Sequence, residues 1–418
     1  MASSLSSNFV AWFKQLSEEQ QSRLLKEALG SKKPKEVNKR FHEISYNDSI
    51  IIRPPTRSVA QDSLQVVTQW HHLKKAAVQL HYQGLVKEMF TSDFCQLVSF
   101  FPNIHTIMIG GNELRADDAE MLARVLSQCK KLKVFSADRN WFGDNGIRHI
   151  ADVLPELPEL ERLDFRKCLI TEDGAKCLGA NIFSSGQVTD IDLSFNSLKD
   201  SGLELLLEQS RKESHHFKKL ILDKTEITSR GMKTLSQHIS LQEMEKLSLE
   251  QNDLGINGIK ILSEMMKNIE VLKLKVLNLT QTNMESDGAI ELSTVLPRLK
   301  NLTEFSIANN NMQDDGMQAI ANNLQNNLSL QAFDIDSNGI RGKGIKCLAN
   351  AMRNHKFPEF QVLSVINNPC AQYILLDLMF AMEKCPKLQH CFISSANIQF
   401  LQADQCDPKQ FPVPLGFF

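Results

Sequence analysis

Apolar residues recur along the chain in a fixed arrangement. The first copy runs from Ile104 to Leu114, with apolar residues at its first, fourth, sixth and eleventh positions and Asn112 at its ninth. We call this ninth position the anchor. Eleven anchors follow one another at spacings of 27 to 30 residues: Asn112, Asn140, Cys168, Asn196, Thr225, Asn252, Thr282, Asn310, Asn338, Asn368 and Ala396. So regular a period predicts a fold built by stacking repeats.

Each copy changes its period part-way through. Before the anchor the pattern alternates, which is typical of a strand whose side chains point to opposite faces. The residues five and three before the anchor are expected in the core, and those six, four and two before it on the outer surface of the sheet. Glycine stands six residues after the anchor in eight successive copies, from Gly146 to Gly344. Aliphatic residues then recur four apart, which places them on one face of a helix.

The sequence therefore predicts an α/β solenoid in which every copy supplies one strand, one loop and one helix. No copy can bury both its strand face and its helix face alone, so stacking must bury them in a continuous core. Neighbouring strands lie about 4.8 Å apart, whereas packed helices need about 8–10 Å. The predicted fold class is a horseshoe with a concave parallel sheet and convex helices.

The repeat L-x-x-L-x-L-x-x-N-x-L, with glycine six after the asparagine, resembles the ribonuclease-inhibitor-like leucine-rich repeat. The Ran GTPase-activating protein and the repeat regions of NLR immune sensors share that pattern. The resemblance covers about residues 100–400. It implies a module that binds another macromolecule on its concave face, acts without a cofactor and is no enzyme, because members share architecture and differ in partner.

The ends of the chain depart from the pattern. Residues 1–70 do not repeat and are expected to form a small helical N-terminal extension. Residues 71–103 are expected to form a degenerate capping repeat around Val78 and Leu80. The repeats themselves occupy 104–403, and 404–418 form a C-terminal tail rich in proline and phenylalanine.

Composition narrows the functional classes. The 418 residues carry a net charge of −2, so no overall basic field favours nucleic acid. No apolar run reaches the length of a membrane span, so no membrane association is expected. The nine cysteines show no C-x-x-C pair, which argues against zinc clusters and disulfide frameworks. We expect a cytoplasmic monomer without a bound metal.

The second to fifth copies gather charged and aromatic residues at the outward-facing strand positions and beside the anchors. These candidate partner-binding residues are Asp138, Arg139, Trp141, Arg162, Asp164, Arg166, Lys167, Asp192, Phe195 and Asp223. Arginine and aromatic side chains are frequent anchors of protein interfaces, and the acidic members suit a basic protein partner. An alternative interpretation is that these charges form intramolecular salt-bridge ladders on a solvated sheet.

Two further interpretations remain open. The resemblance to the Ran GTPase-activating protein implies that Arg139 could touch a nucleotide bound to a small GTPase. Such an array with a short N-terminal extension also resembles secreted effectors of intracellular bacteria such as Legionella, which would place it in a host cytosol among host proteins. No motif predicts a catalytic site. His71–His72 and His215–His216 lack the helical spacing of metal ligands, and Cys168 stands in the anchor column.

Overall fold

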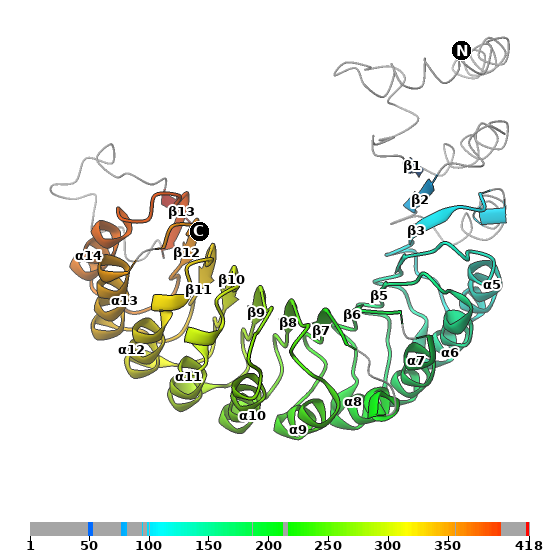
Figure 1. The fold of residues 1–418 in the computed structure, drawn as a ribbon, viewed down its shortest axis with the longest axis horizontal. Coiled ribbons are helices and arrows are strands. Elements are labelled where there is room, and N and C mark those ends of the chain that lie inside the picture. The colour runs from blue at the N-terminus through cyan, green and yellow to red at the C-terminus, as the bar shows by residue number, and fades with distance from the viewer. Residues whose placement is uncertain are drawn as a thin grey trace, which may run out of the picture. The chain divides into compact units, whose positions relative to one another are not determined.

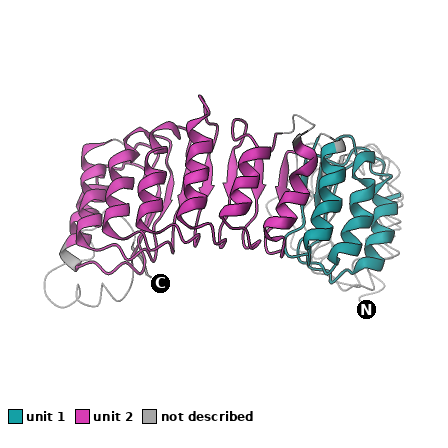
Figure 2. Cartoon of the chain, turned by 90° about the horizontal axis from the view of Figure 1, so that it is seen from below, with its two compact units in different colours: residues 1–188 teal, residues 189–418 magenta. Residues whose placement is uncertain are grey.

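The computed structural model describes residues 49–52, 77–81, 94, 98–99, 101–185, 187–211, 216–355, 357–393 and 415–417. The chain divides into two compact units, which we call unit 1 (Met1–Val188) and unit 2 (Thr189–Phe418; Figure 2). Each unit is a stack of strand–loop–helix repeats with one parallel sheet on one side and helices on the other. None of the described helices is long and apolar enough to cross a bilayer.

The described residues of unit 1 form five strands that pair in chain order and three α-helices (Figure 1). Its elements are β1 (Ser49–Ile52), β2 (Ala77–His81), β3 (Ile104–Met108), α5 (Ala116–Leu126), β4 (Val134–Ser136), α6 (Gly143–Val153), the 3-10 turn η3 (Leu154–Glu156), β5 (Arg162–Asp164) and α7 (Glu172–Ser185). The β4–β5 register joins Val134 to Arg162, so residues 28 apart occupy equivalent places in adjacent repeats.

Unit 2 continues the same order from β6 to β14. Its strands are β6 (Asp190–Asp192), β7 (Lys219–Ile221), β8 (Lys246–Ser248), β9 (Val276–Asn278), β10 (Glu304–Ser306), β11 (Ala332–Asp334), β12 (Val362–Ser364), β13 (His390–Ile393) and β14 (Leu415–Phe417). Its helices are α8 (Lys199–Leu207), η4 (Glu208–Arg211), α9 (Ser229–His238), α10 (Gly255–Lys267), α11 (Glu285–Ser293), η5 (Leu296–Arg298), α12 (Gln313–Asn323), η6 (Leu324–Asn326), α13 (Gly342–Asn354) and α14 (Gln372–Met382).

The core lies between the sheet and the helices of each unit. The residue five before each anchor is buried, as at Phe135 in unit 1 and Phe305 in unit 2, and so is the residue three before it. Phe305 stacks on Phe333 of the next repeat with ring centroids 5.3 Å apart. The predicted strand alternation is therefore confirmed. In Figure 1 the strands of unit 2 line the concave side of its stack and the helices its convex side. The predicted fold class, a leucine-rich-repeat solenoid, is confirmed as well.

The anchor asparagines tie each repeat to the one before it. In unit 2 the Oδ1 of Asn252 accepts hydrogen bonds from the backbone N–H groups of Thr225 and Ile227, at 3.1 and 3.0 Å. Its Nδ2 donates to the backbone oxygens of Leu222 and Leu249. One side chain thus satisfies four buried backbone groups that the loop leaves unpaired. Asn140 in unit 1 and Asn310 in unit 2 make the corresponding bonds.

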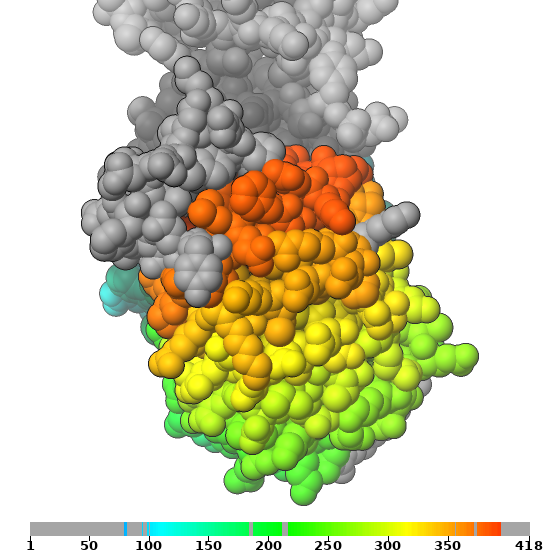
Figure 3. Space-filling model, turned by 90° about the vertical axis from the view of Figure 1, so that its left-hand side faces the viewer, coloured from blue at the N-terminus to red at the C-terminus, as the bar shows by residue number. Residues whose placement is uncertain are grey.

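Two described strands, β1 and β14, fall where the sequence pattern predicted none. β1 lies within the expected helical extension and pairs in parallel with β2, which contains Val78 and Leu80 of the expected capping repeat. At the other end, β14 pairs with β13 inside the predicted tail. Residues 1–48 and 53–70 of the predicted helical extension lie outside the described residues. Figure 3 views unit 2 from its C-terminal end and shows its last repeats stacked in chain order.

Candidate interaction surface

The predicted residues of unit 1 lie on strand β5 and on the loops that follow β4 and β5. Arg162 and Asp164 stand within β5, and Asp138 lies just beyond β4. Arg139 and Lys167 occupy the place before the anchor in their repeats, where both have a left-handed backbone with φ of 54° and 55°. This turn lifts their side chains off the sheet at the edge where the loops rise toward the helices. We call this edge the ascending rim.

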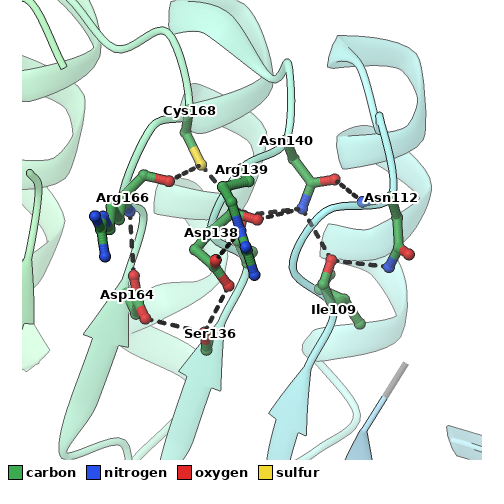
Figure 4. Close-up of polar contacts among 10 residues, drawn as sticks. Ile109, Asn112, Ser136, Asp138, Arg139, Asn140, Asp164, Arg166 and Cys168 are labelled. Carbon is green, nitrogen blue, oxygen red and sulfur yellow. Dashed lines mark hydrogen bonds and ion pairs between the residues drawn. The ribbon is translucent and has the colours of Figure 1, made fainter. Parts of the chain in front are cut away.

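Hydrogen bonds within a repeat and between neighbouring repeats engage the acidic residues of this surface (Figure 4). Ser136 Oγ donates to Asp164 Oδ2 at 3.1 Å, and the backbone N–H of Arg166 donates to Asp164 Oδ1 at 3.1 Å. Arg139 Nε donates to Asp138 Oδ2 at 2.7 Å. The Asp138 side chain is only 13% exposed, whereas that of Arg139 is 61% exposed. The acids are therefore largely occupied within the sheet, and the cationic groups face solvent.

Two apolar side chains of unit 1 stand in solvent at the ascending rim. Trp141 directly follows its anchor and is 45% exposed, and Leu169, which is 58% exposed, occupies the same place one repeat later. The guanidinium of Arg115 lies over the Trp141 ring, 5.5 Å from its centroid. A cation held over an indole face fixes the ring's orientation. Sequence reasoning found Trp141 but missed Leu169 and Arg115, although the column after the anchor could have revealed Leu169.

The predicted residues of unit 2 form a second polar network. Asp223 Oδ1 accepts from Ser248 Oγ at 2.6 Å and from the backbone N–H of Glu250 at 2.9 Å. Asp192 Oδ1 accepts from the backbone N–H of Ser194 at 2.9 Å. Burial raises the pKa of Asp223 to about 6, and the nearby carboxylates of Glu250 and Asp192 act in the same direction. Asp223 therefore accepts hydrogen bonds within the sheet, and its partners there are a hydroxyl and a backbone N–H rather than a cation.

Phe195 also lies at the ascending rim, in unit 2. Its backbone is left-handed with φ of 60°, and its side chain is half-buried. The ammonium of Lys224, one repeat later, lies 5.7 Å from the centroid of its ring. The pairing of a cation with an aromatic ring thus occurs on the ascending rim of both units.

The described cysteines and histidines show no arrangement suited to metal binding or nucleophilic chemistry. No group of three or more potential metal ligands occurs among the described residues. Burial raises the pKa of Cys129 to about 12 and that of Cys385 to about 11, which opposes formation of a reactive thiolate. Cys168 is buried at its anchor, where its Sγ donates to the backbone oxygen of Ala137 at 3.2 Å. His71, His72 and His215 lie outside the described residues.

Comparison with known proteins identifies the repeat. A family model described as "Leucine Rich repeat" matches residues 188–207, 298–321 and 326–349. In these stretches the repeating unit matches a leucine-rich repeat. A chain in the crystal structure of the yeast Rad7 and Elc1 complex shares its fold with a TM-score of 0.57 and 14% identity, covering 99% of this chain and 96% of that one. This likeness concerns the fold alone.

Related sequences occur in proteins that also carry a NACHT domain. Human "NACHT, LRR and PYD domains-containing protein 3" is 31% identical over 209 residues, which cover 50% of this chain and 20% of that protein. Mouse "NACHT, LRR and PYD domains-containing protein 14" is 25% identical over 213 residues, which cover 49% and 21%. The matches thus span about a fifth of the length of these relatives. The similarity supports a leucine-rich-repeat family with NLR-like relatives.

Proposed function

We propose that this protein binds another protein through the strand side and ascending rim of its repeats, without catalysing a reaction. One observation carries the proposal: Trp141, the largest kind of side chain, is 45% exposed yet held against Arg115 in a defined orientation. Tryptophan and arginine dominate the binding energy of protein interfaces. The predicted residues of unit 1, from Asp138 to Lys167, belong to one such proposed surface, and those of unit 2, from Asp192 to Asp223, belong to a second.

The rigidity of the surface favours tight binding. The anchor asparagines and the Ser136–Asp164 and Ser248–Asp223 bonds fix adjacent repeats against each other. A preorganised surface loses little conformational entropy when its partner docks. We infer that the acidic residues mainly build the floor of the surface and that exposed cationic and apolar groups at the ascending rim contact the partner.

Affinity capture from a cytosolic extract tests the proposal. The immobilised full chain is compared with a Trp141→Ala plus Arg166→Glu variant, and captured proteins are quantified by mass spectrometry. Loss of at least tenfold in one set of captured proteins is expected, since each such change commonly costs 1–3 kcal/mol at an interface. Leu328→Ala is the matched control, because Leu328 is 49% exposed but lies in unit 2 away from the predicted residues. Equal capture by both baits would contradict the proposed surface.

Activation of a small GTPase is a second candidate function. Arg139 supports it, because its guanidinium is mostly exposed while Asp138 restrains its Nε at 2.7 Å. An arginine presented in this way could stabilise charge on a transferring phosphoryl group. Single-turnover GTP hydrolysis by candidate GTPases would rise in the presence of the chain and lose that rise with Arg139→Ala. Binding without any change in the hydrolysis rate would contradict GTPase activation and would remain consistent with protein binding alone.

The proposal extends to subtype and setting. We propose the ribonuclease-inhibitor-like subtype because described repeats such as those of α6, α10 and α13 pair a short strand with an α-helix of 11–13 residues. The resemblance to bacterial effectors suggests action on host proteins in the host cytosol. A translocation reporter fused to the chain in its source organism would test that setting, with a non-secreted protein as control.

A further inference from the structure

Leu169 is unusual for an aliphatic residue, because such residues are normally buried and normally have a negative φ. Its side chain is 58% exposed, and its backbone is left-handed with φ of 61°. An L-residue pays about 1–2 kcal/mol for that backbone conformation, and an exposed leucine recovers little by burial. Glu113, Glu226, Asn283 and Asn311 occupy the same place in other repeats with similar φ values, and all four are polar. Folding therefore does not account for a leucine here, and such outliers point to function.

Exposed cations occur in the repeat of Leu169 and in the two repeats before it. Arg115, Arg139 and Lys167 are all exposed in unit 1, in the same or neighbouring repeats as Trp141 and Leu169. We call these five residues the rim patch. The acids beside them are partly compensated, since Asp138 pairs with Arg139. The whole chain carries a net charge of −2, so the positive character of the rim patch is a local feature.

We propose that the rim patch docks an acidic segment of a partner protein, which places a large apolar side chain against Trp141 and Leu169. This inference rests on the proposed function and names the chemistry of the partner. Charge complementarity selects an acidic segment, because the exposed Arg115 and Lys167 add positive charge beyond the Asp138–Arg139 pair, and complementary charge speeds and orients docking. The apolar pair supplies the binding energy that screened surface charges cannot.

A single-stranded nucleic acid is the competing occupant, because tryptophan and arginine can stack on bases. The structure favours a protein segment. Leu169 offers no aromatic face for a second base, and the exposed carboxylate of Glu113 would repel a phosphate backbone. An acidic peptide meets this carboxylate at a single position and can place a neutral residue there.

Peptide selection on the full chain tests this inference. A random dodecapeptide display library is panned on the wild-type protein and counter-screened on Trp141→Ala. Enriched peptides are expected to combine aspartate or glutamate with leucine, phenylalanine or tryptophan. A fluorescein-labelled enriched peptide is expected to bind Trp141→Ala at least tenfold more weakly, and Lys167→Glu several-fold more weakly with a smaller dependence on salt.

Leu169→Gly separates binding from folding. Glycine relieves the left-handed backbone, so the variant is expected to be more stable toward denaturant while it binds the labelled peptide about tenfold more weakly. Glu226→Gly is the matched control, because Glu226 has φ of 63° at the same place of a repeat in unit 2. It should keep wild-type peptide binding, while the relief of its backbone is offset by loss of the hydrogen bond from Ser197 Oγ to Glu226 Oε1. A purely structural role for Leu169 would leave peptide binding unchanged.

Several outcomes would overturn the inference. They are enrichment of basic peptides, equal enrichment on Trp141→Ala, and binding of fluorescein-labelled dT20 that the same substitutions weaken. Partner capture from extract that Leu169→Gly leaves intact would overturn this inference and leave the proposed function standing. Absence of any captured partner, with acidic peptides still selected through Trp141, would contradict the proposed function instead.

Discussion

The carboxylate of Asp200 lies directly beneath the backbone of Gly231, one repeat further along unit 2. Gly231 donates its backbone N–H to Asp200 Oδ1 at 2.8 Å, and Thr228 donates both its backbone N–H and its hydroxyl to the same carboxylate. A Cβ on residue 231 would stand 2.5 Å from that oxygen. The helix of one repeat is thus capped by an acid of the preceding repeat, and the glycine makes room for it.

Alanine at position 231 is expected to destabilise unit 2 by about 2 kcal/mol or more, since the added methyl group displaces the Asp200 carboxylate from the N-terminus of α9. Asp200→Ala should cost about 1–2 kcal/mol, because three donors lose their acceptor. Guanidinium denaturation followed by circular dichroism measures both.

Asp287→Ala is the control, because Asp287 is exposed in the first turn of α11 and caps no neighbouring repeat in the described contacts. Equal losses of stability in Asp287→Ala and Asp200→Ala would mean that the charge of Asp200 near the helix N-terminus, and not its hydrogen bonds, stabilises unit 2.

The anchor column offers a second stability test. Asn252→Leu should destabilise unit 2 by about 3 kcal/mol or more, because it leaves buried donors at Thr225 and Ile227 and acceptors at Leu222 and Leu249 without partners. Thr225→Val removes only one hydroxyl and should cost about 1 kcal/mol. Denaturant midpoints of the two variants compare these costs. Similar losses in both would show that the amide does not bridge the repeats as described.

The sequence predicted the repeat architecture because a single copy encodes it. Alternating apolar positions specify the strand and spacing of four specifies the helix, so the buried columns that include Phe135 and Phe305 followed without knowledge of any neighbour. The capping acids were missed because their partners lie in the next repeat. They also occur only in some copies, at Asp144, Asp200 and Asp314. An alignment of copies therefore hides them.

The candidate surface was predictable only as a set of positions. Alternation showed which columns face outward, but hydrogen bonds between columns decide which charges remain exposed. Asp164 pairs with Ser136 and Asp223 with Ser248, and each pair joins different columns or repeats. Leu169 was overlooked because it stands out through its left-handed backbone, and a leucine in the sequence does not predict that conformation.

At loop positions with a left-handed backbone, replacing glycine should lower stability and introducing glycine should raise it. The residue three after the anchor has φ of 59° at Gly255 and 55° at Glu285, and each donates its N–H to the anchor carbonyl of the next repeat. Gly255→Ala should destabilise unit 2 by about 1 kcal/mol, whereas Glu285→Gly should stabilise it by about 0.5–1 kcal/mol. Thermal melting of both variants against wild type measures the difference. A loss of stability in Glu285→Gly would mean that its side chain makes a compensating contact.

Asp223 makes the stability of unit 2 depend on pH in an unusual direction. Burial raises its pKa from 3.8 to about 6, so the folded state holds the proton more tightly than the unfolded state does. The stability that protonated Asp223 gives the folded state is fully present below about pH 4 and is lost as pH rises through about 6. The shift corresponds to about 2–3 kcal/mol.

The variant Asp223→Asn isolates this effect. An amide oxygen can still accept from Ser248 Oγ and from the Glu250 N–H, and the amide carries no charge beside Asp192 and Glu250. The variant should therefore match wild type near pH 4 and exceed its stability by about 2 kcal/mol at pH 8. Urea denaturation at both pH values gives the difference between the two proteins, so other titrating groups cancel. Asp336→Asn serves as the comparison, because burial also raises the pKa of Asp336, which accepts from Ser364 Oγ at 2.7 Å. If the stability gap of Asp223→Asn does not grow between pH 4 and pH 8, Asp223 is not the group that titrates in this range.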